Sequence, residues 1–398
     1  MTVQSPEFPV GMPENRSSSR ARQVIFSFDD LTWAAAQKRG MCFPQDQLAL
    51  ALIDDPRVEN LLLCDRPRSA PVKLAKDLVE RPLRFESSLR VGLWQPLRWR
   101  RLEPVSVRSL ERTYAAYDKR LQRVAERRGL ARPAVITGQP FIAAFAKLEW
   151  AGPVTLFSTD DLAAHPDYQR WRPSLLTAYE RIAASGRRVC AVTDAIIDRI
   201  CPRGPAAVVP NGVDAGLWAE PGRPPAWFEE LPGPRLLYIG ALGSRIDTEA
   251  MRAVARAFPD GTIALVGPLA ERPHLAKLLE EPNVIVHGAV PREQVAALCH
   301  GADVCLLPHR RTELTEAMSP LKLYEYLASG TPTVATDLAP VRRAGGSIVR
   351  VPPGGDFAAA VRDALAAGPI SEDARREFVA RNSWASRSAE VLDLALAP

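Results

Sequence analysis

The residues best suited to chemistry lie in one short segment, 319–332, whose pattern predicts a capped helix. Ser319 is a favoured N-cap, Pro320 fits the first helical position, and Gly330 stands where the helix should stop. The free N–H groups at such a helix start can hold an anion. The segment is therefore a candidate binding site for a negatively charged ligand.

Two charged residues of this segment, Lys322 and Glu325, are three positions apart, so a helix places them on one face. Lys322 would add positive charge to the anion site, and Glu325 can accept hydrogen bonds from a diol such as ribose. A phosphate site with a carboxylate one turn deeper suits a nucleotide diphosphate sugar. The alternative is a capped helix with a Lys322–Glu325 surface ion pair worth about 0.3 kcal/mol. These residues alone leave both interpretations open.

The elements that must position this segment follow an alternating pattern of apolar strands and helical stretches. In the first half we predict a helix over Trp33–Leu52 and strands over Gln23–Ser27, Val58–Cys64, Ala134–Gly138, Val154–Ser158 and Arg188–Val192. In the second half we predict strands over Arg235–Ile239, Thr262–Val266, Val284–His287, Val304–Leu307 and Thr333–Ala335. Such alternation predicts an α/β protein with parallel sheets covered on both faces. Ligands should then bind at the carboxyl ends of the strands.

Composition places the chain among ordinary globular proteins. Its 398 residues suggest two or three domains, with 46% hydrophobic and 24% charged residues. No apolar run approaches the roughly 20 residues that span a bilayer. Residues 1–22 have no apolar core of a signal peptide, and we expect a disordered lead-in there. The six scattered cysteines form no CxxC pair, which favours a reducing cytoplasm without disulfides or a zinc site.

Positive charge is concentrated in residues 81–132, which hold 14 Lys or Arg against 5 Asp or Glu. Trp94 and Trp99 lie among these arginines, a mixture that suits contact with anionic lipid head groups. The alternative is a solvated helix over Ser109–Arg128, whose apolar residues recur at helical spacing. The first interpretation predicts a protein peripheral to the inner face of the cell membrane, and the second a cytoplasmic one. Nucleic acid is not expected as a partner, because no recognition motif accompanies the charge.

From about Val208 onward, a series of segments occurs in the order and spacing of one enzyme family. The segments are Val209–Asp214 (VPNGVD), Leu236–Leu242, Ile263–Pro268, Asn283–Val290, Ala302–Pro308 and Ser319–Thr333. On these segments the chain resembles the nucleotide-sugar glycosyltransferases of the GT-B fold, in particular the large retaining glycosyltransferase family four (group 1). The N-terminal half resembles that family much less.

The resemblance implies a GT-B fold, in which two Rossmann-like, doubly wound parallel-sheet domains face a central cleft. It implies an acceptor-binding domain over 23–207, a donor-binding domain over 208–383, and a final helix over 384–396 that crosses back onto the first domain. The nucleotide-sugar donor would be bound by Gly240, Arg245, Ala289, Val290, Ser319, Leu321, Lys322 and Glu325. Main-chain groups of 289–290 would meet the nucleobase, and Glu325 the ribose.

Ala241 stands where the family carries an arginine, directly after the first glycine of the phosphate-binding turn. Arg245 is expected to reach the donor phosphates instead. The alternative is an exposed Arg245 that pairs with Asp247 or Glu249.

Ala317 stands where the family's E-x₇-E motif has its first glutamate, eight residues before Glu325. Either Glu316 or Glu313 substitutes from a shifted loop, or this subgroup handles the sugar differently. The basic residues 309–311 could pair with a carboxylate on the sugar, or could lie on a solvated loop.

For catalysis, the candidates are Asp161 and, second, Asp160, because they follow an apolar strand whose carboxyl end should face the cleft. An inverting enzyme needs a base for the acceptor hydroxyl, whereas a retaining enzyme of this fold has no obligatory base. The alternative is that one of the two caps the following helix. Asp30 and Trp33 follow the first strand and are expected on the acceptor side. No cofactor and no metal are expected, since no cluster of metal ligands stands out.

We therefore expect a glycosyltransferase that moves a hexose or hexuronic acid from a UDP- or GDP-sugar to a hydroxyl acceptor. The acceptor would be a lipid-linked oligosaccharide, a glycan or a small molecule in bacterial polysaccharide, glycolipid or natural-product biosynthesis. Two alternatives remain: a UDP-sugar 2-epimerase of the same fold, and a non-catalytic partner of a glycosyltransferase.

Overall fold

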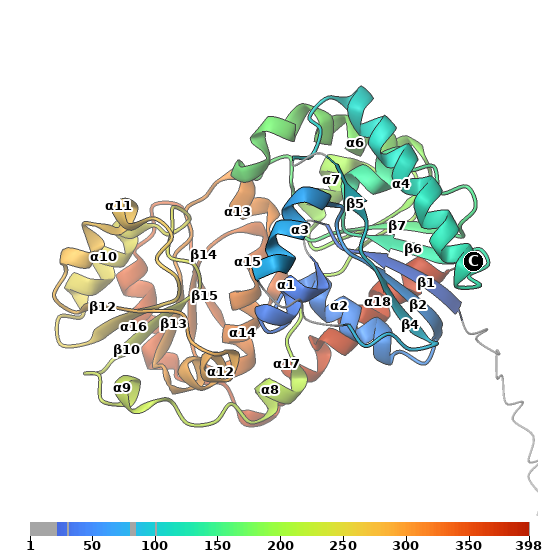
Figure 1. Cartoon of the computed structure of the whole chain (residues 1–398). Helices are drawn as coiled ribbons and strands as arrows, with labels where there is room; N and C mark the ends of the chain where they lie inside the picture. Colours follow the sequence, from blue (N-terminus) through green and yellow to red (C-terminus); the bar gives the residue numbers. More distant parts are fainter. Residues whose placement is uncertain (1–21, 30–31, 80–84, 100–101, 398) are drawn as a thin grey trace, which may run out of the picture.

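The computed structural model describes residues 22–29, 32–79, 85–99 and 102–397, with the backbone alone for 75–79. Two lobes, each built around a parallel sheet, lie side by side (Figure 1). The sheet of the first lobe has seven strands in the order β4-β2-β1-β6-β7-β8-β9. These strands are β1 (Arg22–Ser27), β2 (Val58–Cys64), β4 (Val91–Trp94), β6 (Ala134–Thr137), β7 (Val154–Ser158), β8 (Arg188–Ala191) and β9 (Ala206–Val208). A separate parallel pair joins β3 (Arg68–Ser69) to β5 (Leu97–Arg98).

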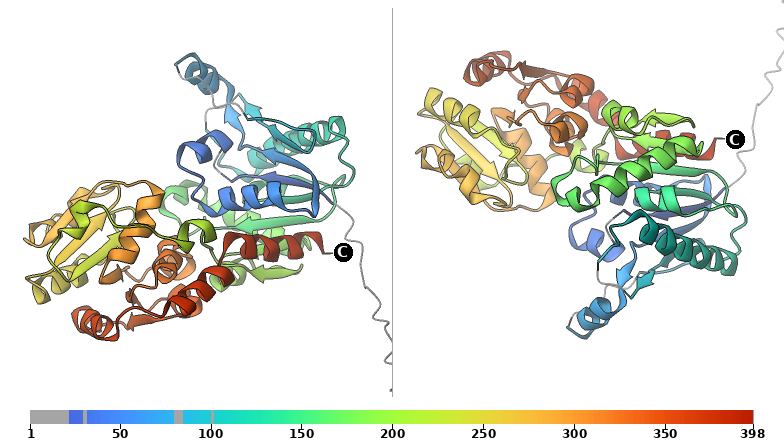
Figure 2. Two further views of the ribbon diagram at one scale, coloured as in Figure 1. Left: turned by 90° about the horizontal axis from the view of Figure 1, so that it is seen from below. Right: turned by 90° about the horizontal axis from the view of Figure 1, so that it is seen from above.

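Helices cover both faces of this first sheet, because successive residues of a strand point to opposite sides. Ile25 of β1 packs on one face with α4 (Val107–Arg127), α5 (Pro140–Phe145), α6 (Arg172–Ala184) and α7 (Asp194–Ile200). Its neighbours Val24 and Phe26 pack on the other face with α1 (Trp33–Lys38), α2 (Pro44–Asp54) and α18 (Trp384–Leu396). The lobe is completed by α3 (Ala70–Val79), which projects from its body (Figure 2), and by the short helix η1 (Pro166–Trp171).

The second lobe repeats the plan with six parallel strands in the order β12-β11-β10-β13-β14-β15. They are β10 (Arg235–Ile239), β11 (Thr262–Val266), β12 (Val284–His287), β13 (Val304–Leu307), β14 (Thr333–Thr336) and β15 (Ile348–Val351). One face packs on α8 (Ala215–Ala219), α9 (Ala226–Glu229), α12 (Arg292–Gly301), α14 (Leu321–Ser329), α15 (Ala339–Ala344) and α17 (Glu372–Arg381). The other packs on α10 (Thr248–Ala257), α11 (Arg272–Leu275), η2 (Leu278–Glu280) and α16 (Phe357–Ala367). A short helix, α13 (Glu313–Ala317), precedes α14.

The chain crosses between the lobes twice, and the two crossings lie against each other. The N–H of Val213 donates to the main-chain oxygen of Asn382 over 2.9 Å. The N–H of Trp384 donates in turn to the oxygen of Val213 over 2.9 Å. Beyond this contact α18 packs on the first sheet through Val391 and Leu392, so the last helix belongs to the first lobe (Figure 1).

The single helix expected over Trp33–Leu52 is wrong, because the structure has two helices, α1 and α2, in this range. Gly40 and Met41 between them adopt positive φ angles of 77° and 52°, a conformation that ends an α-helix. Pro44 then occupies the first position of α2, where its missing N–H costs nothing. Of the lead-in expected over 1–22, only Arg22 lies among the described residues, as the first residue of β1.

None of the helices within the described ranges has both the length and the apolar character that a bilayer-spanning segment needs.

Position 267, directly after β11, needs a glycine for two reasons: its own backbone conformation and the close approach of the backbone of Gly240. Its φ is 143°, and a Cβ at this position would lie 2.2 Å from the main-chain oxygen of Gly240. We predict that Gly267→Ala lowers the free energy of unfolding by about 2 kcal/mol or more, from strain and displacement together. Urea unfolding would measure this loss. Gly288→Ala is the matched control, because nothing lies within 4 Å of its Cβ; equal losses in the two variants would contradict the prediction.

Candidate nucleotide-sugar site

The strand order of the second sheet reverses between β10 and β13, which is where open α/β sheets bind ligands. These strands pair only at Leu236 with Val304 and at Leu237 with Cys305, so they part toward their carboxyl ends. The N–H of Ile239, beyond the last pair, donates to the hydroxyl of Tyr326 over 2.8 Å. A side chain of α14 thus satisfies the strand where the ladder opens, which fixes this helix against the reversal point.

Lys322 lies over the turn that follows β10. Its ammonium donates to the hydroxyl of Tyr238 over 2.6 Å and lies 4.1 Å from the centre of that ring. A Cβ on Gly240, where φ is 127°, would lie 2.6 Å from Nζ of Lys322. Glycine is therefore needed at 240 both for its backbone conformation and for the approach of the lysine. The motif analysis missed Tyr238; its one signal is a polar tip in an otherwise apolar strand.

Lys322 and Glu325 share one face of α14, as predicted, yet they form no ion pair in the described structure. Burial removes hydration from Lys322 and Arg245 repels its charge, which lowers the pKa of Lys322 to about 7. Burial also raises the pKa of Glu325. The half-buried carboxylate of Glu325 has no hydrogen-bond partner among the described residues. The surface ion pair that was the alternative is thus not formed, and both groups remain available to a ligand.

Arg245 is exposed and makes no ion pair with any described residue. The two acids offered as its alternative partners act elsewhere: Asp247 caps α10, and Glu249 pairs with Arg252 over 3.1 Å. The main-chain oxygen of Arg245 accepts the N–H of Arg310 over 2.8 Å. The backbone of Arg245 is therefore fixed beside the carboxyl end of β13, while its guanidinium is left uncompensated.

Ser319 is not the N-cap of the helix, contrary to the prediction. α14 begins at Leu321 with Pro320 at the N-cap and no side-chain cap. The hydroxyl of Ser319 accepts the N–H of Asn211 at 3.4 Å, and its main-chain oxygen accepts the side-chain amide of Asn211 at 2.5 Å. Asn211 lies in the first crossing between the lobes, and this contact turns Ser319 away from the helix. The N–H groups of Leu321 and Lys322 consequently donate to no acceptor in the described chain.

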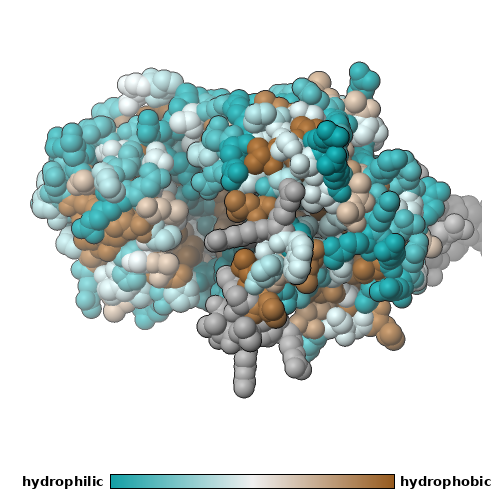
Figure 3. Space-filling model, turned by 45° about the horizontal axis from the view of Figure 1, so that its top comes forward, coloured by the Kyte–Doolittle hydropathy of each residue, from teal (hydrophilic) through white to brown (hydrophobic). Residues whose placement is uncertain are grey.

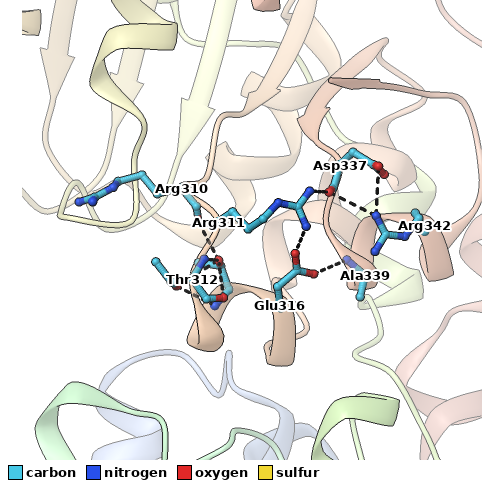
Figure 4. Close-up of polar contacts among 8 residues, drawn as sticks. Arg310, Arg311, Thr312, Glu316, Asp337, Ala339 and Arg342 are labelled. Atoms are coloured by element: carbon cyan, nitrogen blue, oxygen red, sulfur yellow. Dashed lines mark hydrogen bonds and ion pairs between the residues drawn. The ribbon is translucent and has the colours of Figure 1, made fainter. Parts of the chain in front are cut away.

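The acids near Ala317 are engaged in structural contacts (Figure 4). Glu316 pairs with Arg311 and accepts the N–H of Ala339 over 2.8 Å. Arg311 also donates to the main-chain oxygen of Asp337. The side chain of Arg310 points away from this cluster (Figure 4). Glu316 therefore supports the loop and does not replace the carboxylate that Ala317 lacks.

An ion-pair chain links the two lobes and contains Asp161, the first candidate for catalysis. Asp161 follows β7, is 1% exposed, and accepts the N–H of Ala163 over 3.1 Å. Arg199 of α7 pairs with Asp161 and also with Glu313 of α13 in the second lobe. Burial raises the pKa of Asp161, and the charge of Arg199 opposes that rise. The carboxyl end of β7 thus faces the second lobe, and the catalytic role of Asp161 remains a prediction.

Three further residues were predicted to line the site: Asp160, Trp33 and Asp30. Asp160 is half-buried beside Asp161. Trp33 is in the core: it is 7% exposed, its main-chain N–H donates to the carboxylate of Asp65 over 2.7 Å, and its ring meets that of Phe85 edge-on. Asp30 lies outside the described residues.

The nucleobase candidates, Ala289 and Val290, follow β12 at the same edge of the sheet as Gly240. Ala289 is exposed. His287, at the end of β12, stacks on Trp227 with ring centres 4.2 Å apart. At this end of the sheet the exposed residue Ala289 therefore follows closely on the stacked rings of His287 and Trp227.

The fold and the sequence of the second lobe resemble those of known glycosyltransferases. Residues 233–367 match the family "Glycosyl transferases group 1", so the second lobe contains a domain of that family. Over 134 residues the chain is 31% identical to the Bacillus subtilis (strain 168) protein named "Putative teichuronic acid biosynthesis glycosyltransferase TuaH". That match includes 33% of this chain and 34% of the relative, so the chain spans about a third of the length of the curated relative it matches.

Solved structures resemble almost the whole chain. Sucrose-phosphate synthase from Thermosynechococcus elongatus superposes with a TM-score of 0.68 at 17% identity, over 94% of this chain and 98% of that one. Anabaena HepE, solved with UDP and glucose, superposes with a TM-score of 0.61 at 15% identity, over 95% of this chain and 100% of that one. A UDP-forming trehalose-phosphate synthase from Burkholderia vietnamiensis superposes with a TM-score of 0.63 at 15% identity, over 94% of this chain and 100% of that one. The expected GT-B fold is thereby confirmed.

We predict that Arg199→Met lowers the free energy of unfolding by about 3 kcal/mol, because it leaves the carboxylate of Asp161 buried and unpaired. Asp161→Asn in the same chain should restore part of this loss. Glu313→Gln is the control, because it removes the other partner of Arg199. The side chain of Glu313 is 52% exposed, so this change should lower the free energy of unfolding by at most about 0.5 kcal/mol. Chemical denaturation of the four proteins measures these differences. Equal, small losses for Arg199→Met and Glu313→Gln would contradict the role of the buried pair.

Proposed function

We propose that the protein is a glycosyltransferase that moves a hexose or hexuronic acid from a UDP- or GDP-sugar to a hydroxyl acceptor. The supporting observation is that Lys322 and Arg245 lie at the strand reversal with no carboxylate partner among the described residues. A donor diphosphate supplies the negative charge that this place lacks. The family domain and the GT-B fold agree with this assignment.

In the proposed complex the diphosphate lies against the turn at Gly240. The free N–H groups of Leu321 and Lys322 point along the start of α14 toward it, and Arg245 approaches from the opposite loop. Glu325 accepts hydrogen bonds from the ribose, and backbone groups of 289–290 hold the nucleobase. Negative charge grows on the diphosphate as the sugar departs, so these fixed donors stabilise the transition state more than the ground state. We propose that no metal and no further cofactor is required.

The acceptor is proposed to bind in the first lobe, beside the carboxyl end of β7. Asp161 is held by Arg199, so we assign it first to shaping this wall. Asp160, half-buried beside it, is the second candidate to accept a hydrogen bond from the incoming hydroxyl. If the reaction inverts the anomeric centre, one of these carboxylates is the base; if it retains it, the donor phosphate can take the proton.

Uridine is the nucleotide favoured by the relatives, since the HepE structure contains UDP and the trehalose-phosphate synthase is described as UDP-forming. Synthesis of a bacterial polysaccharide is favoured by the name of the curated relative, which refers to teichuronic acid. We therefore propose a UDP-sugar donor and a glycan or lipid-linked acceptor.

We predict that UDP raises the melting temperature of the purified protein by a few degrees, because a ligand at 100 times its Kd stabilises by about 2.7 kcal/mol. Glu325→Ala should abolish most of this shift, because the ribose loses its acceptor. Glu316→Ala is the matched control, since Glu316 is paired with Arg311 and not with the site. A thermal-shift titration with UDP, GDP and dTDP measures all three proteins.

The outcomes separate the proposed function from its alternatives. A larger shift with GDP than with UDP would change the donor class and keep the reaction. A UDP-sugar that binds but is isomerised without an acceptor would identify an epimerase. Binding without transfer or hydrolysis would identify a non-catalytic partner, and no shift with any nucleotide would overturn the proposed site.

An anionic membrane surface is the second partner that we propose, on the basis of the exposed residues of the first lobe. Trp99 and Leu102 are 84% and 57% exposed. β5, which precedes them, contacts α4 through a 2.7 Å hydrogen bond from Arg120 to the oxygen of Leu97. α4 exposes a row of cations without ion pairs among the described residues: Arg108, Arg112, Lys119, Arg123 and Arg127. Hydrophobic patches interrupt the hydrophilic surface of this lobe, and the molecule is hollowed between the lobes (Figure 3).

We predict that the protein sediments with vesicles that contain phosphatidylglycerol and not with pure phosphatidylcholine vesicles. Each exposed cation near an anionic surface contributes about 1 kcal/mol, so Arg112→Glu with Arg123→Glu should abolish binding. Lys277→Glu, on the second lobe, is the control and should bind like the unchanged protein. Equal binding to both kinds of vesicle, or none to either, would refute the membrane proposal while leaving the transferase proposal intact.

A further inference from the structure

His309 is a buried side chain whose hydrogen-bonding groups are not satisfied. It follows β13 by two residues and is 1% exposed. Neither ring nitrogen has a hydrogen-bond partner in the structure. Buried polar groups are almost always paired, since an unpaired one loses its water without a replacement. The two nitrogens of His309 therefore have no partner among the described residues.

The surroundings of His309 indicate the charge that a partner would carry. Its ring meets the edge of Tyr238 at 6.4 Å between centres, the same tyrosine whose hydroxyl accepts from Lys322. Its backbone pairs with Ile246, next to Arg245. The charged groups that act on the imidazole are Lys322 and Arg245, both cationic. No carboxylate among the described residues acts on the imidazole itself, although Glu325 partly offsets the charge of Lys322.

These charges also determine the state of the ring in the free protein. Burial, together with repulsion from Lys322 and Arg245, holds the pKa of His309 well below its ordinary range. A neutral imidazole has one N–H to donate and adds no third positive charge to the site. The ring is thus prepared to donate to an anion that the two cations have already attracted.

We infer that His309 is a binding residue of the donor site, and that its imidazole donates an N–H to the diphosphate gripped by Lys322 and Arg245. This inference rests on the proposed function and adds a contact to it. It also explains why the chain places a histidine beneath two cations without giving it a partner of its own. The ligand class is a diphosphate, either free or as part of a nucleotide.

The test measures the Kd of UDP and of inorganic pyrophosphate by titration calorimetry for the unchanged protein and for His309→Phe. Loss of one hydrogen bond to a charged group should weaken both ligands by a similar factor, about 10- to 100-fold. His309→Gln or His309→Asn, which place an amide N–H near one of the two ring nitrogens, should recover part of the affinity. His165→Phe, in the first lobe, is the matched control and should bind both ligands normally.

A second measurement does not depend on whether the Phe variant folds. The chain has 5 histidines, so the ring nitrogens of His309 can be resolved in ¹⁵N-labelled protein and assigned with the Gln variant. Their resonances should move when pyrophosphate is added to the unchanged protein. Unmoved resonances, or a Phe variant that binds both ligands as tightly as the unchanged protein, would overturn the inference and leave the donor site standing. Failure of the unchanged protein to bind UDP, GDP and pyrophosphate would overturn the proposed function as well.

Discussion

The second lobe is organised around two cations that its own carboxylates do not neutralise. Lys322 approaches within hydrogen-bond distance of one group, the hydroxyl of Tyr238, and this approach requires the absence of a side chain at Gly240. Gly267 is required in turn, because its own Cβ would collide with the oxygen of Gly240. A half-buried ammonium without an anion is unfavourable, as the lowered pKa of Lys322 records. The unliganded protein therefore carries positive charge that no ion pair with a described residue compensates and that an anionic ligand would neutralise.

The same lobe uses its nearby acids to hold the structure together. Glu313 reaches Arg199 of the first lobe, and Glu316 holds Arg311 and the start of α15. The side-chain hydroxyl of Thr193, at the start of α7, donates to the main-chain oxygen of Ala317 over 2.6 Å. With Asn211 bound to Ser319, the segment 313–319 is fastened to the first lobe at several points. Any rearrangement of the lobes would thus be transmitted to the start of α14, where the donor phosphates are proposed to bind.

Sequence patterns predicted the two parallel sheets because an apolar run between helices has few other structures available to it. The end of α14 at Gly330 is confirmed, with φ at 75°, because only local backbone geometry decides it. The N-cap at Ser319 was wrong for the opposite reason: its competitor, Asn211, is 108 residues away in sequence. The break between α1 and α2 has a local signal in Gly40 and Pro44, which the helical spacing of the apolar residues over 33–52 outweighed in the prediction. Tyr238 and the ion-pair chain through Arg199 were likewise invisible, since each depends on contacts between distant segments.

The charges already present on α13 are one physical reason why position 317 carries no glutamate. A carboxylate there would stand four residues after Glu313 on α13, and like charges at that spacing repel. It would also lie at the peptide whose oxygen is bound by Thr193. In this chain the acids of α13 face the other lobe and the loop, while the ligand side keeps Lys322, Arg245 and the imidazole of His309. In the proposed complex such a site binds the donor chiefly through its diphosphate, and the half-buried carboxylate of Glu325 is left to bind the ribose.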